Sequence, residues 1–420
     1  MVQQKVKYTD TERTPAERAR ALLEEMTLDE KMAQLGCIFP FGDSYDDMEQ
    51  QALEMPYGIG QVSTLEMRRI GTLEEAAGWQ RKMQETVMRQ SPHHIPAIFH
   101  MEGLCGAFIQ EGTSFPSGIA RGSGWDPELE EKIAKVVAKQ EAACGITHIL
   151  APVLDISRDS RMGRQGETYG EDPALAAALG AAYTKGIQTT EAGGRRPESV
   201  AKHFLGFHNS QGGIHGTNSD TPSRLMEEIY GKPFQSAISE SELKGVMPCY
   251  NSIDGEPASV SHRLLTELLR EKMGFDGLCV SDYGGINNAH EVQRIGETIG
   301  ETGLLAMEAG MDIEMPKATG YGEELKEMFR SGQADTELLD RTVLRVLEAK
   351  FRMGLFEHPF AMDGESCQKI FEEKEGAELS FRSARESMVL LKNNGILPLS
   401  GKIKTVSYTH LRAHETRGNL

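Results

Sequence analysis

Short apolar runs alternate with amphipathic, helix-like stretches along most of this chain, and each run ends in polar or glycine-rich residues. Alternation of this kind predicts parallel strands joined by helices, and eight strands is the number that closes a (β/α)8 barrel. A doubly wound sheet shows the same alternation, so at this point it stays open as an alternative. We expect strands at 35–39, 59–63, 96–102, 148–156, 199–204, 245–250, 277–282 and 311–316.

Several helix boundaries are signalled by their end residues. Thr14 and Thr27 are each followed three positions later by a glutamate, which is the pattern of a capping box. The stretch 127–143 follows Asp126, a typical N-cap, and the stretch 262–273 precedes Gly274, a typical C-cap. These signals place helices between the expected strands, as a barrel requires.

The composition changes after the amphipathic stretch 342–359. We therefore predict a TIM-barrel-like α/β domain over residues 1–359, and we interpret the polar, acidic segment 360–380 as a linker. Residues 381–400 are expected to form a further helix and turn, so that 360–400 leads into the start of a second domain. Residues 401–420 continue without apolar partners, and we expect a truncated or non-native tail there.

Charge and cysteine content narrow the classes of function. The chain has 45 basic and 63 acidic side chains, a formal charge of −18, which disfavours nucleic acid as a partner. No apolar run approaches the roughly 20 residues of a membrane helix. The polar N-terminus lacks the apolar segment of a signal peptide, so a cytoplasmic location is expected. The six cysteines form no CxxC pair and no HExxH motif occurs, so neither disulfides nor a metal site is predicted, and the thiols should be buried and reduced.

Polar side chains stand at the ends of the expected strands, where the active sites of barrel enzymes lie. They are Glu102, Asp155 with Arg158 just beyond, Lys202, His203, Tyr250, Asp282 and Glu314. Carboxylates, cations and a phenol at one rim suit a polyhydroxylated ligand. Glycoside hydrolysis needs two carboxyl groups, about 5–5.5 Å apart in a retaining enzyme, one of which attacks the sugar. Asp282, followed closely by Gly284, is the candidate nucleophile.

Each of these residues also has a structural interpretation. A strand-end aspartate such as Asp282 can cap a helix or anchor a loop, Lys202 and His203 can belong to an ordinary ion pair, and Tyr250 can be a core residue. Glu314 can simply hold a cation elsewhere at the rim. The functional interpretation depends on all of them meeting at one end of the barrel.

Longer blocks of this sequence resemble glycoside hydrolase family 3, most closely its β-glucosidase and β-xylosidase branch. The blocks cover 95–116, 157–173, 201–213, 245–257, 273–286 and 309–316, occur in the family's order and extend the resemblance over roughly 15–400. The resemblance implies a TIM-barrel-like domain followed by an α/β sandwich. It also implies a retaining mechanism with a covalent glycosyl-enzyme intermediate.

Site roles follow from the resemblance residue by residue. Asp282 matches the nucleophile, and the positions that hold the sugar are Glu102, Arg158, Lys202, His203 and Tyr250. The general acid/base of this branch is usually a glutamate of the second domain, so none is assigned here. Another branch uses a loop histidine, for which His215 is a possible substitute. Two departures are Cys105, where members often have histidine, and Met162, where they often have tryptophan.

The function implied is a retaining, exo-acting β-glycosidase that removes terminal β-glucosyl or β-xylosyl units, impaired without the second domain. It would need no metal or organic cofactor, and its partner would be a small-molecule or oligosaccharide β-glycoside. A catalytically silent sugar-binding fragment or scaffold is the alternative from another class. An aldolase using Lys202 as a Schiff base is a third option. The sugar and the oligomeric state are left open.

Overall fold

The predicted strand segments lie side by side in one curled parallel sheet. The computed structural model describes residues 6–40 and 54–402. Within these residues seven strands pair in the order β1-β2-β3-β4-β5-β6-β9. Their bounds are Cys37–Ile38 (β1), Gln61–Ser63 (β2), Ile98–Met101 (β3), His148–Ile149 (β4), Glu198–Phe204 (β5), Gly245–Pro248 (β6) and Leu278–Cys279 (β9). Every neighbouring pair is parallel.

The eighth predicted run closes the sheet on itself. Ile313 forms a parallel bridge with Val280, and its carbonyl accepts a hydrogen bond of 2.9 Å from the Ser281 amide. The amide of Glu314 donates across the seam to the Leu35 carbonyl, also at 2.9 Å. The segment that contains Ile313 and Glu314 therefore pairs both with the residues that follow β9 and with those that precede β1. The barrel prediction is confirmed, and the doubly wound alternative is wrong because an open sheet would have left both edges unpaired.

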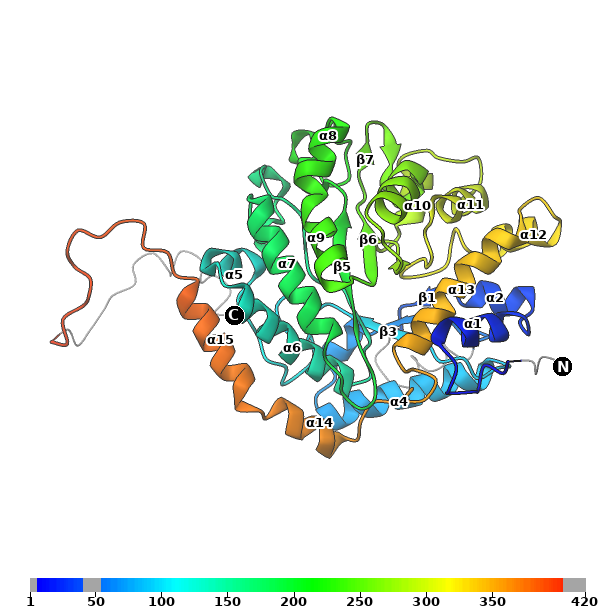
Figure 1. Ribbon diagram of the computed structural model, residues 1–420, viewed down its shortest axis with the longest axis horizontal. Coiled ribbons are helices and arrows are strands. Elements are labelled where there is room, and N and C mark those ends of the chain that lie inside the picture. The colour runs from blue at the N-terminus through cyan, green and yellow to red at the C-terminus, as the bar shows by residue number, and fades with distance from the viewer. Residues whose placement is uncertain (1–5, 41–53, 403–420) are drawn as a thin grey trace. The chain divides into compact units, whose positions relative to one another are not determined.

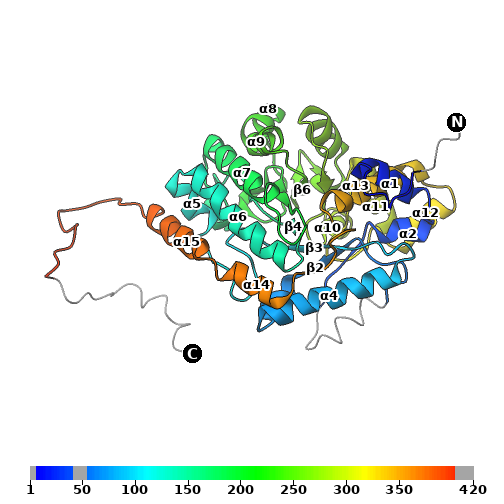
Figure 2. The same ribbon diagram turned by 60° about the horizontal axis from the view of Figure 1, so that its bottom comes forward.

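Helices cover the outside of the sheet, as Figures 1 and 2 show from two directions. The capping boxes at Thr14 and Thr27 and the cap at Asp126 are present as predicted. The segment Arg263–Lys272 (η8) is a π-helix, followed by Gly274 at φ +76°. The α-helices are Pro15–Leu23 (α1), Leu28–Ala33 (α2), Leu73–Gln90 (α4), Gly118–Gly124 (α5), Pro127–Ala143 (α6), Pro173–Gln188 (α7), Ser223–Leu225 (α8), Lys232–Ser241 (α9), Gly285–Glu291 (α10), Ile299–Ala309 (α11), Glu323–Arg330 (α12), Thr336–Arg352 (α13), Gly364–Phe371 (α14) and Lys374–Glu386 (α15).

Shorter elements occupy the loops between these helices. They comprise a small antiparallel hairpin and a set of 3-10 and π turns. They are Ser252–Ile253 (β7), Glu256–Pro257 (β8), Leu65–Arg69 (η1), Ser160–Met162 (η2), Gln165–Glu167 (η3), Phe207–Asn209 (η4), Gln211–Gly213 (η5), Met226–Tyr230 (η6) and Ala258–Val260 (η7).

The segment expected to be a linker folds as two helices instead. Residues 360–380 contain α14 and the start of α15, which pack against α4, α5 and α6. Cys367 and Phe371 are buried at helical spacing, and Leu379 is buried on α15. These apolar side chains outweigh the acidic composition that suggested a linker. The first compact unit accordingly runs to Ser387, and Met388–Leu420 forms a second unit.

The expected helix over 381–400 corresponds to the end of α15, because no helix follows Glu386 in the described residues. Most of the tail predicted at 401–420 lies outside the described residues, which end at 402.

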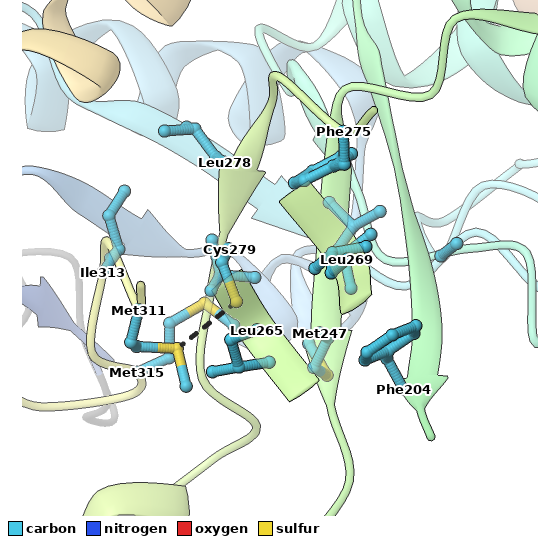
Figure 3. Packing of buried hydrophobic residues seen from close by; sticks show 14 of the residues in the cluster. Phe204, Met247, Leu265, Leu269, Phe275, Leu278, Cys279, Met311, Ile313 and Met315 are labelled. Atoms are coloured by element: carbon cyan, nitrogen blue, oxygen red, sulfur yellow. Dashed lines mark hydrogen bonds between the residues drawn. The ribbon is translucent and has the colours of Figure 1, made fainter. Parts of the chain in front are cut away.

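A packed sulfur-rich core fixes the position of the seventh strand. Figure 3 shows Cys279 of β9 beside Met311, with 3.8 Å between Sγ and Sδ, and Met315 close by. Leu265 and Leu269 of η8 cover the same strand, and all these side chains are buried. Close packing of this kind permits little movement. The packing therefore holds β9 in a fixed position, and with it the start of the segment that leads to the carboxyl-terminal rim.

Candidate active site

The carboxyl-terminal ends of β3, β5, β6 and β9 bring five of the predicted site residues to one rim of the barrel. They are Glu102, Lys202, His203, Tyr250 and Asp282. Parallel strands all end at the same edge of the sheet, so residues far apart in the sequence meet there. Asp155, which follows β4, joins the same cluster.

Asp282 stands in the short connection between β9 and α10. Its Oδ1 accepts a hydrogen bond of 2.7 Å from the Tyr283 amide, which orients the carboxylate. Its Oδ2 has no hydrogen-bond partner among the described residues and lies 3.7 Å from Nε2 of His203. The side chain keeps 15% of its surface exposed. One oxygen of this carboxylate is thus held in place by the backbone, while the other is buried beside His203 and has no hydrogen-bond partner among the described residues.

His203 is fixed by the carboxylate of Asp155. Its Nδ1 donates to Oδ2 of Asp155 at 2.8 Å, and its backbone amide reaches the same oxygen at 3.2 Å. Burial lowers the pKa of His203 well below its ordinary value. The positive charges of Lys202 and Arg164 lower this pKa further, whereas the negative charge of Asp282 raises it. The imidazole is therefore neutral, with its lone pair on Nε2. That nitrogen accepts a hydrogen bond of 3.3 Å from Nη2 of Arg164.

Lys202 and Glu102 form an ion pair inside the rim. The ammonium group donates to both carboxylate oxygens, at 2.8 and 2.7 Å. The Lys202 side chain is only 4% exposed, whereas 28% of the Glu102 side chain is exposed. A buried ammonium needs such a partner. The exposed edge of the carboxylate still has lone pairs that can accept from hydroxyl groups.

Tyr250 lies next to Asp282 and closes the cluster on the β6 side. Its hydroxyl donates to the Tyr283 carbonyl at 2.8 Å. Burial and then the negative charge of Asp282 raise the pKa of Tyr250, so the phenol stays protonated. The ring of His215 lies against it, with 5.1 Å between ring centroids. Burial has the opposite effect on a histidine and lowers the pKa of His215.

Arg158 does not join this cluster, contrary to the sequence-based expectation. It is exposed, and in the part of the chain that the structure describes it makes no hydrogen bond or ion pair with any of the five residues. The guanidinium that reaches His203 belongs to Arg164, six residues further on. Arg164 is held in turn by a bidentate pair with Glu167, at 2.7 and 2.8 Å, and lies over the ring of Phe207.

Glu314 anchors a loop. Its carboxylate accepts hydrogen bonds from the Thr319 hydroxyl and from three backbone amides, those of residues 319, 320 and 321. All of these partners come from the loop that follows the last barrel segment. The structure therefore gives Glu314 the capping role that an isolated strand-end carboxylate often has, and within the described ranges no salt bridge to it is found.

Asp155 gives the stability of the protein a measurable pH dependence. Burial raises the pKa of Asp155 to about 6 from the ordinary 3.8. Its contribution to the free energy of unfolding is therefore present below the unfolded-state pKa and is lost as the pH rises through about 6. Between pH 4 and 7 this loss should amount to about 2 kcal/mol. Denaturation curves at several pH values should show the slope in the parent and not in Asp155→Asn, whose amide oxygen still accepts from His203. Equal slopes would contradict the prediction.

Two further properties of the described residues bear on function. None of their helices is both long and apolar enough to cross a bilayer. In residues 6–40 and 54–402, no three histidine, cysteine, aspartate or glutamate side chains are placed to share a metal ion.

A closed parallel barrel with buried ion pairs and the unpartnered Oδ2 of Asp282 at its carboxyl-terminal rim defines a TIM-barrel-like α/β domain with a preformed polar site. Residues 27–349 match the description "Glycosyl hydrolase family 3 N terminal domain". The chain belongs to glycosyl hydrolase family 3. The resemblance found in the sequence is thereby confirmed.

Relatives and solved structures agree with this assignment. A β-xylosidase of Formosa agariphila is 33% identical over 341 residues, which are 77% of this chain and 47% of the relative. A β-glucosidase of Rhizobium radiobacter is 34% identical over 69% of this chain and 33% of its own length. A β-glucosidase structure from Erythrobacter marinus superimposes with a TM-score of 0.87 at 32% identity, covering 94% of this chain and 52% of that one. The chain thus spans about half the length, or less, of these relatives.

Proposed function

We propose that this chain carries the sugar-binding and nucleophilic half of a retaining, exo-acting β-glycosidase that acts on terminal β-glucosyl or β-xylosyl units. The observation that carries the proposal is the geometry of Asp282, whose Oδ1 is fixed by a backbone amide while Oδ2 is unpartnered among the described residues. The β-glucosidase and β-xylosidase relatives support the choice of substrate class.

In the proposed reaction Oδ2 of Asp282 attacks the anomeric carbon from the face opposite the leaving group. The bond to the aglycone oxygen breaks, and a glycosyl ester of Asp282 forms. Water then attacks the same carbon from the other face and releases the sugar with its original configuration. The pair of Lys202 and Glu102 would hold the hydroxyls of the sugar, and the neutral His203 would position Arg164 beside them.

The leaving oxygen needs a proton, and we assign no residue of the chain to this step. His215 lies near Asp282, but burial holds its pKa below the ordinary value, and a neutral imidazole is a weak acid. General acid assistance contributes about 10²–10⁴-fold. The rate should therefore depend strongly on the aglycone, with nitrophenyl glycosides cleaved far faster than disaccharides.

The proposal is tested by following the hydrolysis of 4-nitrophenyl β-glucoside and β-xyloside by proton NMR. The first sugar released should be the β-anomer, because two displacements at one carbon retain its configuration. Cellobiose should react more slowly by a factor within the range of general acid assistance. An α-anomer as first product would exclude the covalent mechanism. Sugar binding without any turnover, even of the nitrophenyl glycosides, would favour a silent sugar-binding protein.

A further inference from the structure

Inside the barrel, a row of polar side chains connects strands that are not neighbours in the sheet. Gln61 and Ser63 of β2, His100 of β3 and His148 of β4 are each no more than 2% exposed. Tyr283, which follows β9, completes the row. The interior of a parallel barrel is usually filled by apolar, branched side chains. A continuous polar row in that place therefore indicates a specific role.

Hydrogen bonds join these side chains end to end. The Tyr283 hydroxyl lies 2.8 Å from Nε2 of His100 and 2.8 Å from Oγ of Ser63. Nδ1 of His100 lies 2.9 Å from Oε1 of Gln61, and Nε2 of Gln61 lies 3.2 Å from Nδ1 of His148. In the sheet, β9 is separated from β3 by β4, β5 and β6. The bond between Tyr283 and His100 therefore crosses the interior of the barrel.

The direction of these hydrogen bonds follows from the Gln61 amide and from the neutral state of His100. Burial lowers the pKa of His100 to about 3, so its ring carries a single N–H hydrogen. Nδ1 donates that hydrogen to Oε1 of Gln61, and Nε2 then accepts from the Tyr283 hydroxyl. Because the phenol has no second hydrogen, Ser63 donates the one that joins it to Tyr283. His100 is thus the acceptor that holds Tyr283.

Tyr283 in turn orients the candidate nucleophile. Its backbone amide donates to Oδ1 of Asp282 at 2.7 Å, and its carbonyl accepts from Tyr250 at 2.8 Å. The Tyr283 ring also packs edge-on against Phe39, with 6.1 Å between ring centroids. Holding the far end of this side chain restricts the rotation of the backbone that carries the amide. The position of the Asp282 carboxylate therefore depends on how Tyr283 is held.

We propose that His100 is a positioning residue which, together with Gln61 and Ser63, fixes Tyr283 and through it the carboxylate of Asp282. Positioning matters only if Asp282 attacks a sugar, so this role rests on the proposed glycosidase function. In the part of the chain that the structure describes, none of the three forms a hydrogen bond or ion pair with Asp282. Their effect on the reaction passes through Tyr283, and a misplacement of about 1 Å can lower a rate about 10²-fold.

Two amide variants of His100 separate positioning from general stability. The side-chain amide of glutamine reaches the place of Nε2, and that of asparagine reaches the place of Nδ1. His100→Gln keeps an acceptor for Tyr283 and should hydrolyse 4-nitrophenyl β-glycosides within about threefold of the parent rate. His100→Asn keeps only the bond to Gln61, and its kcat should fall about 30-fold. Each variant loses one buried hydrogen bond, so a purely structural residue would respond to both changes alike.

Further measurements accompany these rates. The affinity for glucose or xylose should not change in His100→Asn, because the pair of Lys202 and Glu102 is untouched. Tyr283→Phe removes the hydroxyl and should lower kcat by a similar factor. Combined with His100→Asn it should lower kcat no further, since both changes break the same contact. His262→Gln, at a histidine whose side chain is 57% exposed, is the control and should keep the parent rate.

Nitrogen NMR of the His100 ring gives a check that needs no turnover. Nδ1 should carry the hydrogen, and the Nε2 resonance should shift in Tyr283→Phe; an unshifted resonance would overturn the proposal. It is also overturned if His100→Asn is as fast as His100→Gln, if the loss appears in sugar affinity and not in kcat, or if the double variant loses the product of the two single effects. In those three outcomes the parent chain is active and the proposed function stands. A parent chain without any turnover would overturn both.

Discussion

Asp282→Asn is expected to lower kcat/KM for 4-nitrophenyl β-glycosides by on the order of 10⁴-fold or more, because an amide cannot form the glycosyl ester. The loss should appear in kcat, since in the proposed reaction Oδ2 acts on the transition state while other groups would hold the sugar hydroxyls. A 2-deoxy-2-fluoro-β-glycoside with a good leaving group gives a second measurement. It should add one glycosyl mass to the peptide containing Asp282 in the parent chain and none in the variant.

Asp276→Asn is the matched control for that change. Asp276 lies just before β9, is 73% exposed and pairs with Lys244 at the surface. The same loss of one negative charge should there leave the rate within about twofold of the parent, as is usual for surface substitutions. If Asp282→Asn kept the parent rate, or if the label appeared on another residue, Asp282 would not be the nucleophile.

Arg164→Gln is expected to reduce kcat/KM about 100-fold, and Arg158→Gln should change it by less than about twofold. Arg164 donates to Nε2 of His203 and is the guanidinium whose charge Asp282 experiences. Its loss leaves the neutral imidazole without its donor and Glu167 without its partner. Affinity for glucose or xylose, measured by calorimetry, should fall in parallel.

The two variants remove the same charge from the same loop, so each serves as control for the other. Equal effects on sugar affinity would mean that the loop as a whole acts through stability. A larger effect at Arg158 would restore the assignment made from the sequence alone. Thermal denaturation of both variants separates these outcomes from simple unfolding.

The barrel could be predicted because two patterns alternate along the sequence. Buried parallel strands produce short continuous apolar runs, and the amphipathic helices between them repeat apolar residues about every 3.6 positions. All eight runs lie in the barrel, although regular pairing is often only two residues long, as in β4 and β9. The closure between Leu35 and Glu314 could not be predicted, because it depends on the sum of strand tilts and on no local pattern. The sequence alone thus left the doubly wound sheet open.

The site was predictable as far as it lies on strands. Lys202 is placed by the register of β5, His203 follows it at an irregularity of that strand, and Asp282 comes three residues after β9, so a sequence pattern of apolar runs locates all three. The arginine is placed by a loop that turns twice, at Ser160–Met162 and Gln165–Glu167, before α7 begins. Arg158, Arg161 and Arg164 follow one another at equal spacing, and only the folded loop distinguishes them. The one local signal was Glu167, three residues after Arg164 and suitably placed to pair with it.

The extent of the domain was underestimated for a different reason. Residues 360–380 are rich in charge, and average composition concealed the buried positions 367 and 371. These two are four apart, as on one face of a helix, which a window of helical periodicity would have detected.

The seam between Leu35 and Glu314 has a consequence for synthesis of the protein. The first strand lies near the start of the chain, and its partner across the seam is made almost 280 residues later. Until that segment leaves the ribosome, the growing sheet keeps two open edges whose amides and carbonyls can pair with other chains. Contacts so distant in sequence also form slowly. The nascent chain is thus most exposed to aggregation just before residue 314 is made, and chaperone protection would be needed most at that stage.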